Sequence, residues 1–181
     1  LSVDEWGCVN PSVGGNHTAQ VCHNDTSIIQ NAITSNSAVG KKSIVLNAKT
    51  YNSSLLSIPN NFGLVGTSYI TKIKKLPWTG GEASALNGKF IVAQTLTGAT
   101  SLSIVGVDID GVAPNQFLWP DSTTVNRNYL LDFGINCNSL LLDRVRITNS
   151  PAGGVYATSP VELKINTSEI VDSATTDRYE Y

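Results

Sequence analysis

A short repeat of apolar residues limits the possible folds of this chain more than any other feature. Residues 139–150 align without a gap with residues 162–173, at an offset of 23. The aligned apolar pairs are Leu140 with Leu163, Leu142 with Ile165, and Ile147 with Ile170. Earlier copies begin near Ser101 and, more weakly, near Phe62. Their wider offsets indicate insertions between the repeats.

The repeat predicts a stack of short strands. Leu-x-Leu alternation places two side chains on one side of a strand, and a short bend lets the following Val-x-Ile face the same interior. One repeat cannot bury its apolar side alone, so repeats must stack as a solenoid. An ordinary β-sandwich with coincidental similarity is the alternative. We expect one shared core that contains Leu140, Leu142, Val145, Ile147, Leu163, Ile165 and Ile170.

The chain divides into three parts. Residues 1–24 read as an irregular lead-in, and residues 25–36 as a short amphipathic helix with Gly40 as its stop. Asp25 or Ser27 is the expected N-cap, and Ser27 with Gln30 has capping-box spacing. The expected apolar face consists of Ile28, Ile29, Ala32 and Ile33. Residues 37–181 form the stacked coils, which we expect to continue in a longer protein.

Charge and cysteine content argue against several classes of function. The net charge is −2, and Lys72, Lys74 and Lys75 form the densest basic group, so nucleic-acid binding is not expected. No apolar run approaches the length of a membrane span. The absence of a Cys-x-x-Cys pair disfavours zinc, and we expect no metal and no cofactor. Whether Cys8 and Cys22 form a disulfide stays open.

Four segments carry a resemblance to a known family. They are Val3-Asp-Glu-Trp-Gly7, the helix segment Asn24–Ile33, the segment Ser43–Tyr51, and Phe62-Gly-Leu-Val-Gly66 followed by Thr71-x-Ile73. Together they resemble the opening of phage tailspike and pectate-lyase-3-like proteins. This resemblance implies an all-β fold, a right-handed, single-stranded parallel β-helix of about 23 residues per coil with an N-terminal capping helix.

The resemblance also implies a function. Members of this family cleave, or only bind, bacterial surface polysaccharide such as capsule or O-antigen, and many are homotrimers. We therefore expect a depolymerase, either glycosidase or lyase, located in a phage virion tail or secreted. Its active site lies either in this chain or elsewhere in a longer protein. A non-catalytic receptor-binding or structural β-helix module is the alternative.

Two acidic residues are the candidate catalytic groups. Asp108 and Asp110 are two positions apart, so an extended strand places both on one side, opposite Val107 and Ile109. Glycoside hydrolysis uses such a pair of carboxylates. The alternative is that both are solvated outward residues. The repeat aligns Asp108 with Arg146 and Glu169, which predicts an outward ladder of alternating charge.

Aromatic residues in the insertions are the candidate carbohydrate-binding groups. Trp119 and Asp121 lie in the segment 112–126, which interrupts the repeat, and Trp78 lies beside two glycines. Loops on a rigid scaffold often hold functional residues, and aromatic rings suit stacking on sugars. Alternatively, these loops pack on a neighbouring coil or subunit.

Overall fold

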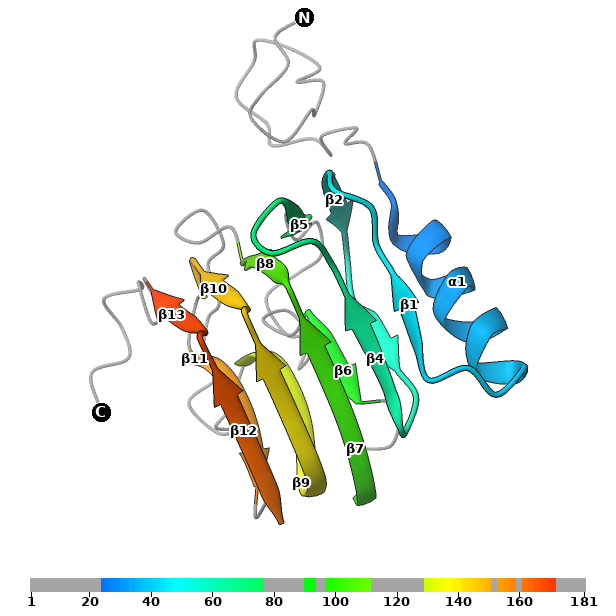
Figure 1. Cartoon of the computed structure of the whole chain (residues 1–181), viewed down its shortest axis with the longest axis vertical. Coiled ribbons are helices and arrows are strands. Elements are labelled where there is room, and N and C mark those ends of the chain that lie inside the picture. The colour runs from blue at the N-terminus through cyan, green and yellow to red at the C-terminus, as the bar shows by residue number, and fades with distance from the viewer. Residues whose placement is uncertain are drawn as a thin grey trace, which may run out of the picture.

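A computed structural model describes residues 24–76, 90–93, 97–111, 129–150, 153–158 and 161–171 of the chain. Most of these residues lie in strands, and the described part contains one helix (Figure 1). The elements are α1 (Thr26–Ala38), β1 (Ser43–Val45), β2 (Thr50–Ser53), β3 (Leu56–Ile58), β4 (Phe62–Val65), β5 (Thr71–Lys75), β6 (Ile91–Ala93), β7 (Thr97–Val105), β8 (Val107–Asp110), β9 (Tyr129–Asp143), β10 (Arg146–Thr148), β11 (Gly153–Thr158), β12 (Glu162–Asn166) and β13 (Glu169–Val171).

The strands form two sheets, and every pairing between described strands is parallel. The five-stranded sheet has the order β13-β10-β8-β5-β2. The eight-stranded sheet has two arms that share the long strand β9. In the first arm the end of β9 pairs with β7 and β12, and in the second arm its beginning pairs with β6 and β11.

The chain visits these three groups of strands in a fixed order. It passes from the first arm to the five-stranded sheet, then to the second arm, and then back to the first arm. Each return enters the same group from the same direction, so neighbouring strands run parallel. The prediction of an all-β fold with parallel strands and one short helix is confirmed.

The register agrees with the repeat found in the sequence. Leu140 pairs with Leu163, Leu142 with Ile165, and Ile147 with Ile170, all at the offset of 23. The earlier copies of the repeat lie in register with the later ones. Phe62 pairs with Leu102, at an offset of 40, and Leu102 pairs with Leu140, at an offset of 38. Residues 77–89 and 112–128 account for the wider offsets and lie outside the described residues.

The core lies between the three groups of strands. Its inward rows are made of aliphatic and aromatic residues, and Leu140, Leu142, Val145 and Ile147 are all buried there. The last repeat was predicted to point into the same core, but its side chains are not buried there. Leu163, Ile165 and Ile170 face the same side as their partners but are 51%, 50% and 48% exposed. Among the described strands, β12 and β13 each have a neighbour on one side only, so half of each side chain stays uncovered.

Helix α1 packs against β1 and β3 at the opposite end of the stack (Figure 1). Ile29 and Ile33 are buried beneath it, as predicted, whereas Ile28 is 64% exposed and does not belong to the buried face. The helix ends before Gly40, which has φ +79°, a left-handed conformation that suits glycine. The first residues of the helix differ from the predicted capping arrangement.

The predicted capping box does not form. Asp25 occupies the N-cap position without a side-chain cap, and its Oδ2 instead accepts a hydrogen bond of 3.0 Å from the backbone N of Asn52. The Gln30 side chain bonds the backbone of Ser57 twice, donating from Nε2 at 3.0 Å and accepting at Oε1 at 2.9 Å. Tertiary partners therefore take both side chains away from the local cap.

The corner between the first arm and the five-stranded sheet repeats a backbone conformation. Gly106, Arg144 and Thr167 stand at equivalent corners and have φ of +65°, +53° and +46°. Hydrogen bonds between neighbouring corners continue the ladder, because Gly106 N donates to Asp143 O at 2.8 Å and Arg144 N to Asn166 O at 2.9 Å. The left-handed residue thus turns the chain without interrupting the stack.

Candidate functional site

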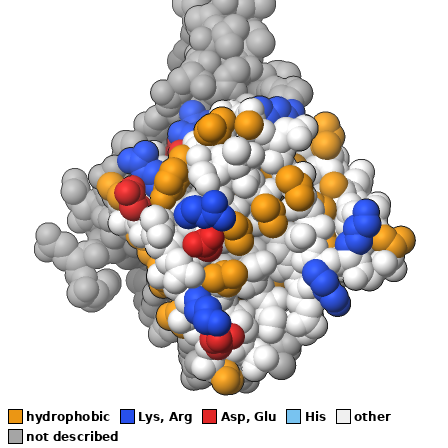
Figure 2. Space-filling model, viewed as in Figure 1, with side chains coloured by type: hydrophobic (Ala, Val, Ile, Leu, Met, Phe, Trp, Pro, Cys, Tyr) orange, Lys and Arg blue, Asp and Glu red, His pale blue; other side chains and the backbone are white. Residues whose placement is uncertain are grey.

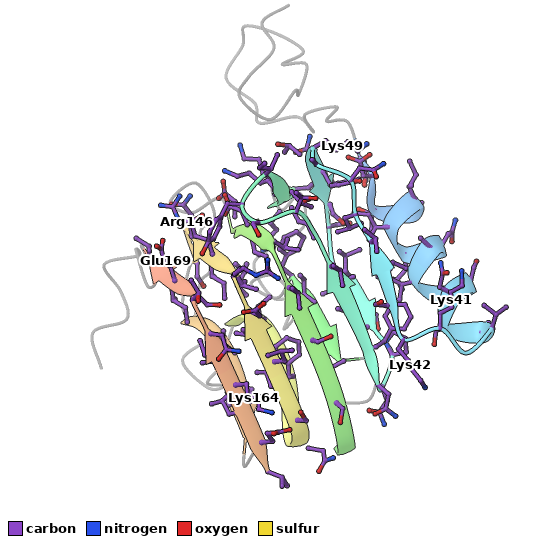
Figure 3. The ribbon with its side chains drawn as sticks, viewed as in Figure 1. Lys41, Lys42, Lys49, Arg146, Lys164 and Glu169 are labelled. Carbon is purple, nitrogen blue, oxygen red and sulfur yellow. The ribbon has the colours of Figure 1, made fainter. Side chains whose placement is uncertain are left out.

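The outer face of the five-stranded sheet carries a row of alternating charge, which we call the charged row: Lys72, Asp108, Arg146 and Glu169. These residues are paired from β5 to β13. Lys72 Nζ lies 3.2 Å from Asp108 Oδ2, and Arg146 Nε lies 3.4 Å from Glu169 Oε2. Figure 3 shows Arg146 and Glu169 side by side on β10 and β13. The predicted register of Asp108, Arg146 and Glu169 is confirmed, and Lys72 is a member of the row that the repeat did not reveal.

Asp108 lies in the middle of the charged row and is almost fully buried. It is 5% exposed, so the alternative of a solvated outward aspartate is wrong. Strand β8 lies between β5 and β10 in the sheet. Its Oδ2 meets Lys72, whereas its buried Oδ1 has no hydrogen-bond partner within the described structure. A buried acceptor without a donor is costly, and such a group calls for an explanation.

Asp110 lies two residues further along β8 and faces the same side. It is 8% exposed, so it is not solvated either. Its Oδ1 accepts a hydrogen bond of 2.9 Å from Asn149 Nδ2. Asn149 has φ +52°, and Gly111 makes room for its backbone, because a Cβ on Gly111 would lie 2.4 Å from Asn149 O. The end of β10 is thereby fixed beside the second carboxylate.

Positions i and i+2 of an extended strand are about 6.7 Å apart along the chain, so Asp108 and Asp110 lie next to each other on one side of β8. Inverting glycosidases use two carboxyl groups about 6.5–9.5 Å apart, and retaining ones use two about 5–5.5 Å apart. Lys74 pairs with Asp110 across the sheet, so each aspartate has a lysine beside it on β5. The arrangement can hold one group that donates a proton and one that accepts it.

A buried lysine lies on the inner side of the same sheet. Lys75 continues the inward alternation of Thr71 and Ile73 at the end of β5, and it is buried. Burial lowers the pKa of its ammonium group to about 8. Sequence reasoning treated this residue only as part of the densest basic group. The sequence could have predicted this burial, because Lys75 lies two positions after Ile73 and an extended strand places both on the same side.

Trp119, Asp121 and Trp78 lie outside the described residues, as do Cys8 and Cys22. Within the described ranges, no three His, Cys, Asp or Glu side chains come together in a way that could hold a metal ion. The helix found in these ranges is too short and too polar to cross a membrane.

On the face seen in Figure 2, some Lys and Arg side chains lie beside Asp or Glu and others lie apart, and this face shows no continuous patch of one sign. Comparison with family models, with curated proteins and with solved structures finds no match for this chain.

Proposed function

We propose that this chain is part of a right-handed parallel β-helix of the tailspike or pectate-lyase-like type, and that it binds and cleaves bacterial surface polysaccharide. The fixed order in which the chain visits three groups of parallel strands supports a β-helix, as does α1 at one end. The observation that carries the function is the buried pair Asp108 and Asp110 on an outer face, with one carboxylate oxygen of Asp108 left without a donor.

The proposed reaction is hydrolysis with inversion. Asp108 Oδ1 accepts a proton from a water molecule, and the water oxygen forms a bond to the anomeric carbon. The bond from that carbon to the leaving oxygen breaks, and Asp110 acts as the general acid that donates a proton to that oxygen. Lys72 holds the Asp108 carboxylate from the other oxygen, and Asn149 holds Asp110.

The wider setting follows from the resemblance in the sequence. The substrate class is capsule or O-antigen, the protein is a homotrimer on a phage virion tail or a secreted protein, and Trp119, Asp121 and Trp78 contact the sugar. Aromatic faces of this kind stack on saccharide rings, and the adjacent carboxylate accepts hydroxyl hydrogen bonds.

A second candidate function is a non-catalytic module that binds polysaccharide or only supports a longer stack. The observation that favours it is the engagement of both aspartates by neighbouring strands, through Lys72 on β5 and Asn149 on β10. In this case the charged row serves only to bridge adjacent strands electrostatically. Asp108 and Asp110 then have no role in turnover.

The test is incubation of the purified chain with a panel of capsular and O-antigen polysaccharides, followed by assays for new reducing ends and for unsaturated uronates. We expect reducing ends and no unsaturated uronates, and nuclear magnetic resonance should show the inverted anomer first. Asp108→Asn and Asp110→Asn should each lower the rate by roughly 100-fold or more, the usual contribution of a general acid or base.

Asp143→Asn is the matched control, because Asp143 is a partly exposed aspartate of β9 that pairs with Arg144 and lies away from Asp108 and Asp110. It should keep full activity. Binding without products would establish the second candidate. Unsaturated uronates would replace hydrolysis by lyase chemistry, and absence of both binding and products would refute the proposed function.

A further inference from the structure

The corner between β4 and β5 is longer than the corner that follows it in the stack. Five residues separate Val65 from Thr71, whereas Gly106 alone separates their partners Val105 and Val107. We call the four additional residues the corner insert: Thr67, Ser68, Tyr69 and Ile70. The strands on both sides keep the register of the stack, so the corner insert is not required for their pairing.

The corner insert lies against the corner that precedes β8 (Figure 1). A Cβ on Gly106 would lie only 3.0 Å from Ser68 N, so the two corners are in close contact. Gly106 comes two residues before Asp108, and positions i and i+2 of an extended chain are about 6.7 Å apart. The corner insert therefore borders the charged row beside Asp108.

Two side-chain hydrogen bonds fix the corner insert across later corners. Tyr69 Oη donates a hydrogen bond of 2.9 Å to Thr167 O. Arg144 Nη1 donates one of 3.2 Å to Ser68 Oγ. Gly106, Arg144 and Thr167 stand at successive corners, so the Tyr69 side chain reaches past two corners to a third. It therefore extends in the direction in which the charged row runs, from β5 toward β13.

Tyr69 combines an accessible ring with an unusual backbone conformation. Its φ is +61°, a left-handed value that is uncommon for a bulky residue. Such conformations persist where surrounding contacts impose them, and they cluster at functional sites. The side chain is 40% exposed although its hydroxyl is bonded to the backbone of Thr167. The ring is thus held in place at one end and remains accessible along its body.

We propose that Tyr69 forms a saccharide-stacking subsite beside Asp108 and Asp110. One face of a pyranose ring is made of C–H groups, which pack on an aromatic ring while the hydroxyl groups stay in water. A polysaccharide bound along the charged row brings the sugar unit next to the cleaved bond onto Tyr69. This inference rests on the proposed function, because it assigns Tyr69 to the same substrate.

A purely structural role is the alternative, in which Tyr69 only ties β13 to the earlier corners. The two roles depend on different parts of the side chain, because stacking needs the ring and the tie needs the hydroxyl. Tyr69→Phe keeps the ring and removes the hydrogen bond to Thr167 O. Tyr69→Leu removes the hydroxyl and the ring but keeps an apolar side chain.

The experiment measures the binding of capsular and O-antigen polysaccharides by calorimetry, in chains that carry Asp108→Asn so that turnover is suppressed. Tyr69→Leu should weaken binding about tenfold, as the loss of a contacting aromatic residue does. Tyr69→Phe should stay within about threefold of the parent, since only one exposed hydrogen bond is lost. Ile70→Ala is the matched control, because Ile70 is an exposed residue of the same insert without an aromatic ring. It should leave the affinity unchanged.

Nuclear magnetic resonance gives a readout that does not depend on the stability of the leucine variant. Saturation of the Tyr69 ring protons, assigned by comparison with Tyr69→Phe, should transfer to C–H protons of the bound polysaccharide. Parent affinity in Tyr69→Leu would overturn the subsite and leave the proposed function standing. Equal losses in Tyr69→Leu and Tyr69→Phe would assign Tyr69 to the structural tie.

Two further outcomes separate the subsite from the proposed reaction. Binding that depends on the Tyr69 ring, in a parent chain that releases no products, would support the subsite and refute only the cleavage. Absence of binding to every polysaccharide of the panel would overturn both the subsite and the proposed function.

Discussion

Single residues in this structure are constrained mainly by the close approach of one corner to the next. Gly106 combines φ +65° with a neighbouring corner so near that a Cβ would lie 2.7 Å from Gly66 O and 3.0 Å from Ser68 N. Arg144 and Thr167 adopt the same left-handed region at later corners. A side chain is therefore tolerated where the adjoining corner leaves space, and glycine is required where it does not.

Gly106→Ala should destabilise the protein by about 2–4 kcal/mol, since the new methyl group adds a backbone clash to the cost of a left-handed alanine. Gly40→Ala is the matched control, because Gly40 has φ +79° but no atom within 4 Å of its Cβ position. It should cost about 1–2 kcal/mol. Urea unfolding of both variants measures the difference, and equal costs would rule out the clash.

The buried Lys75 should make stability depend on pH. Its pKa is about 8 in the folded protein and near 10.5 in the unfolded chain. Between these values the unfolded chain binds the proton and the folded protein does not, so stability rises with pH. Below about pH 8 the burial penalty is present in full, and it is progressively relieved as the pH increases.

Lys75→Met removes the titrating group while keeping an unbranched side chain. The variant should be more stable than the parent at pH 7. Its advantage should shrink by about 2 kcal/mol between pH 7 and pH 9.5, at about 1.4 kcal/mol per pH unit above the folded pKa. Denaturant unfolding at both pH values tests this. A difference that does not change with pH would show that Lys75 keeps an ordinary pKa.

At the scale of elements, helix α1 takes the place of a neighbouring strand beside β3. Strand β3 pairs with β6 on one side and faces α1 on the other. The Gln30 side-chain amide meets the N–H and the C=O of Ser57, as the peptide group of a neighbouring strand would. With Ile29 and Ile33, helix α1 thereby covers the apolar core at this end of the stack. With Gln30, it satisfies the backbone hydrogen-bonding groups of Ser57 on the edge strand β3.

Gln30→Ala should cost about 1–3 kcal/mol, because it leaves the partly buried backbone groups of Ser57 without partners. Thr34→Ala is a suitable control on the same helix, since the Thr34 hydroxyl is exposed and bonds only the helix backbone at Gln30 O. That change should alter stability by less than about 0.5 kcal/mol. Thermal unfolding distinguishes the two, and similar effects would show that the Gln30 bonds contribute little.

For the whole molecule, stability should vary along the stack, because each pass contacts only its neighbours. Leu142 lies in the interior between Ile104 and Ile165, and Leu163 lies on the last described strand of the same arm. Both residues point to the core, but they differ in how much of the side chain is covered.

Leu142→Ala should therefore cost about 2–5 kcal/mol, the usual range for a buried leucine. Leu163→Ala, with half of the side chain exposed, should cost less than about 1.5 kcal/mol. Urea unfolding of the two variants provides the comparison. Equal destabilisation would mean that the last strand is as fully packed as the interior.

The sequence alone determined the alternation of apolar residues, the 23-residue register and the short helix. These follow from local periodicity, since a strand or helix must place its apolar side chains on one side. The match of Asp108 with Arg146 and Glu169 follows from the same periodicity, because residues at equal positions of stacked repeats become neighbours.

Only the tertiary structure decided how deeply each residue is buried. Asp108 and Asp110 were expected to be either a functional pair or solvated, and both are buried on the central strand β8. Leu163 and Ile165 match buried partners in sequence pattern yet remain half exposed, because β12 is the last described strand of its arm. The expected capping box of Ser27 and Gln30 does not form, because the Gln30 side chain bonds the backbone of Ser57, which lies 27 residues further along the chain. Periodicity gives the direction of a side chain, whereas its burial and partners depend on what the rest of the chain places beside it.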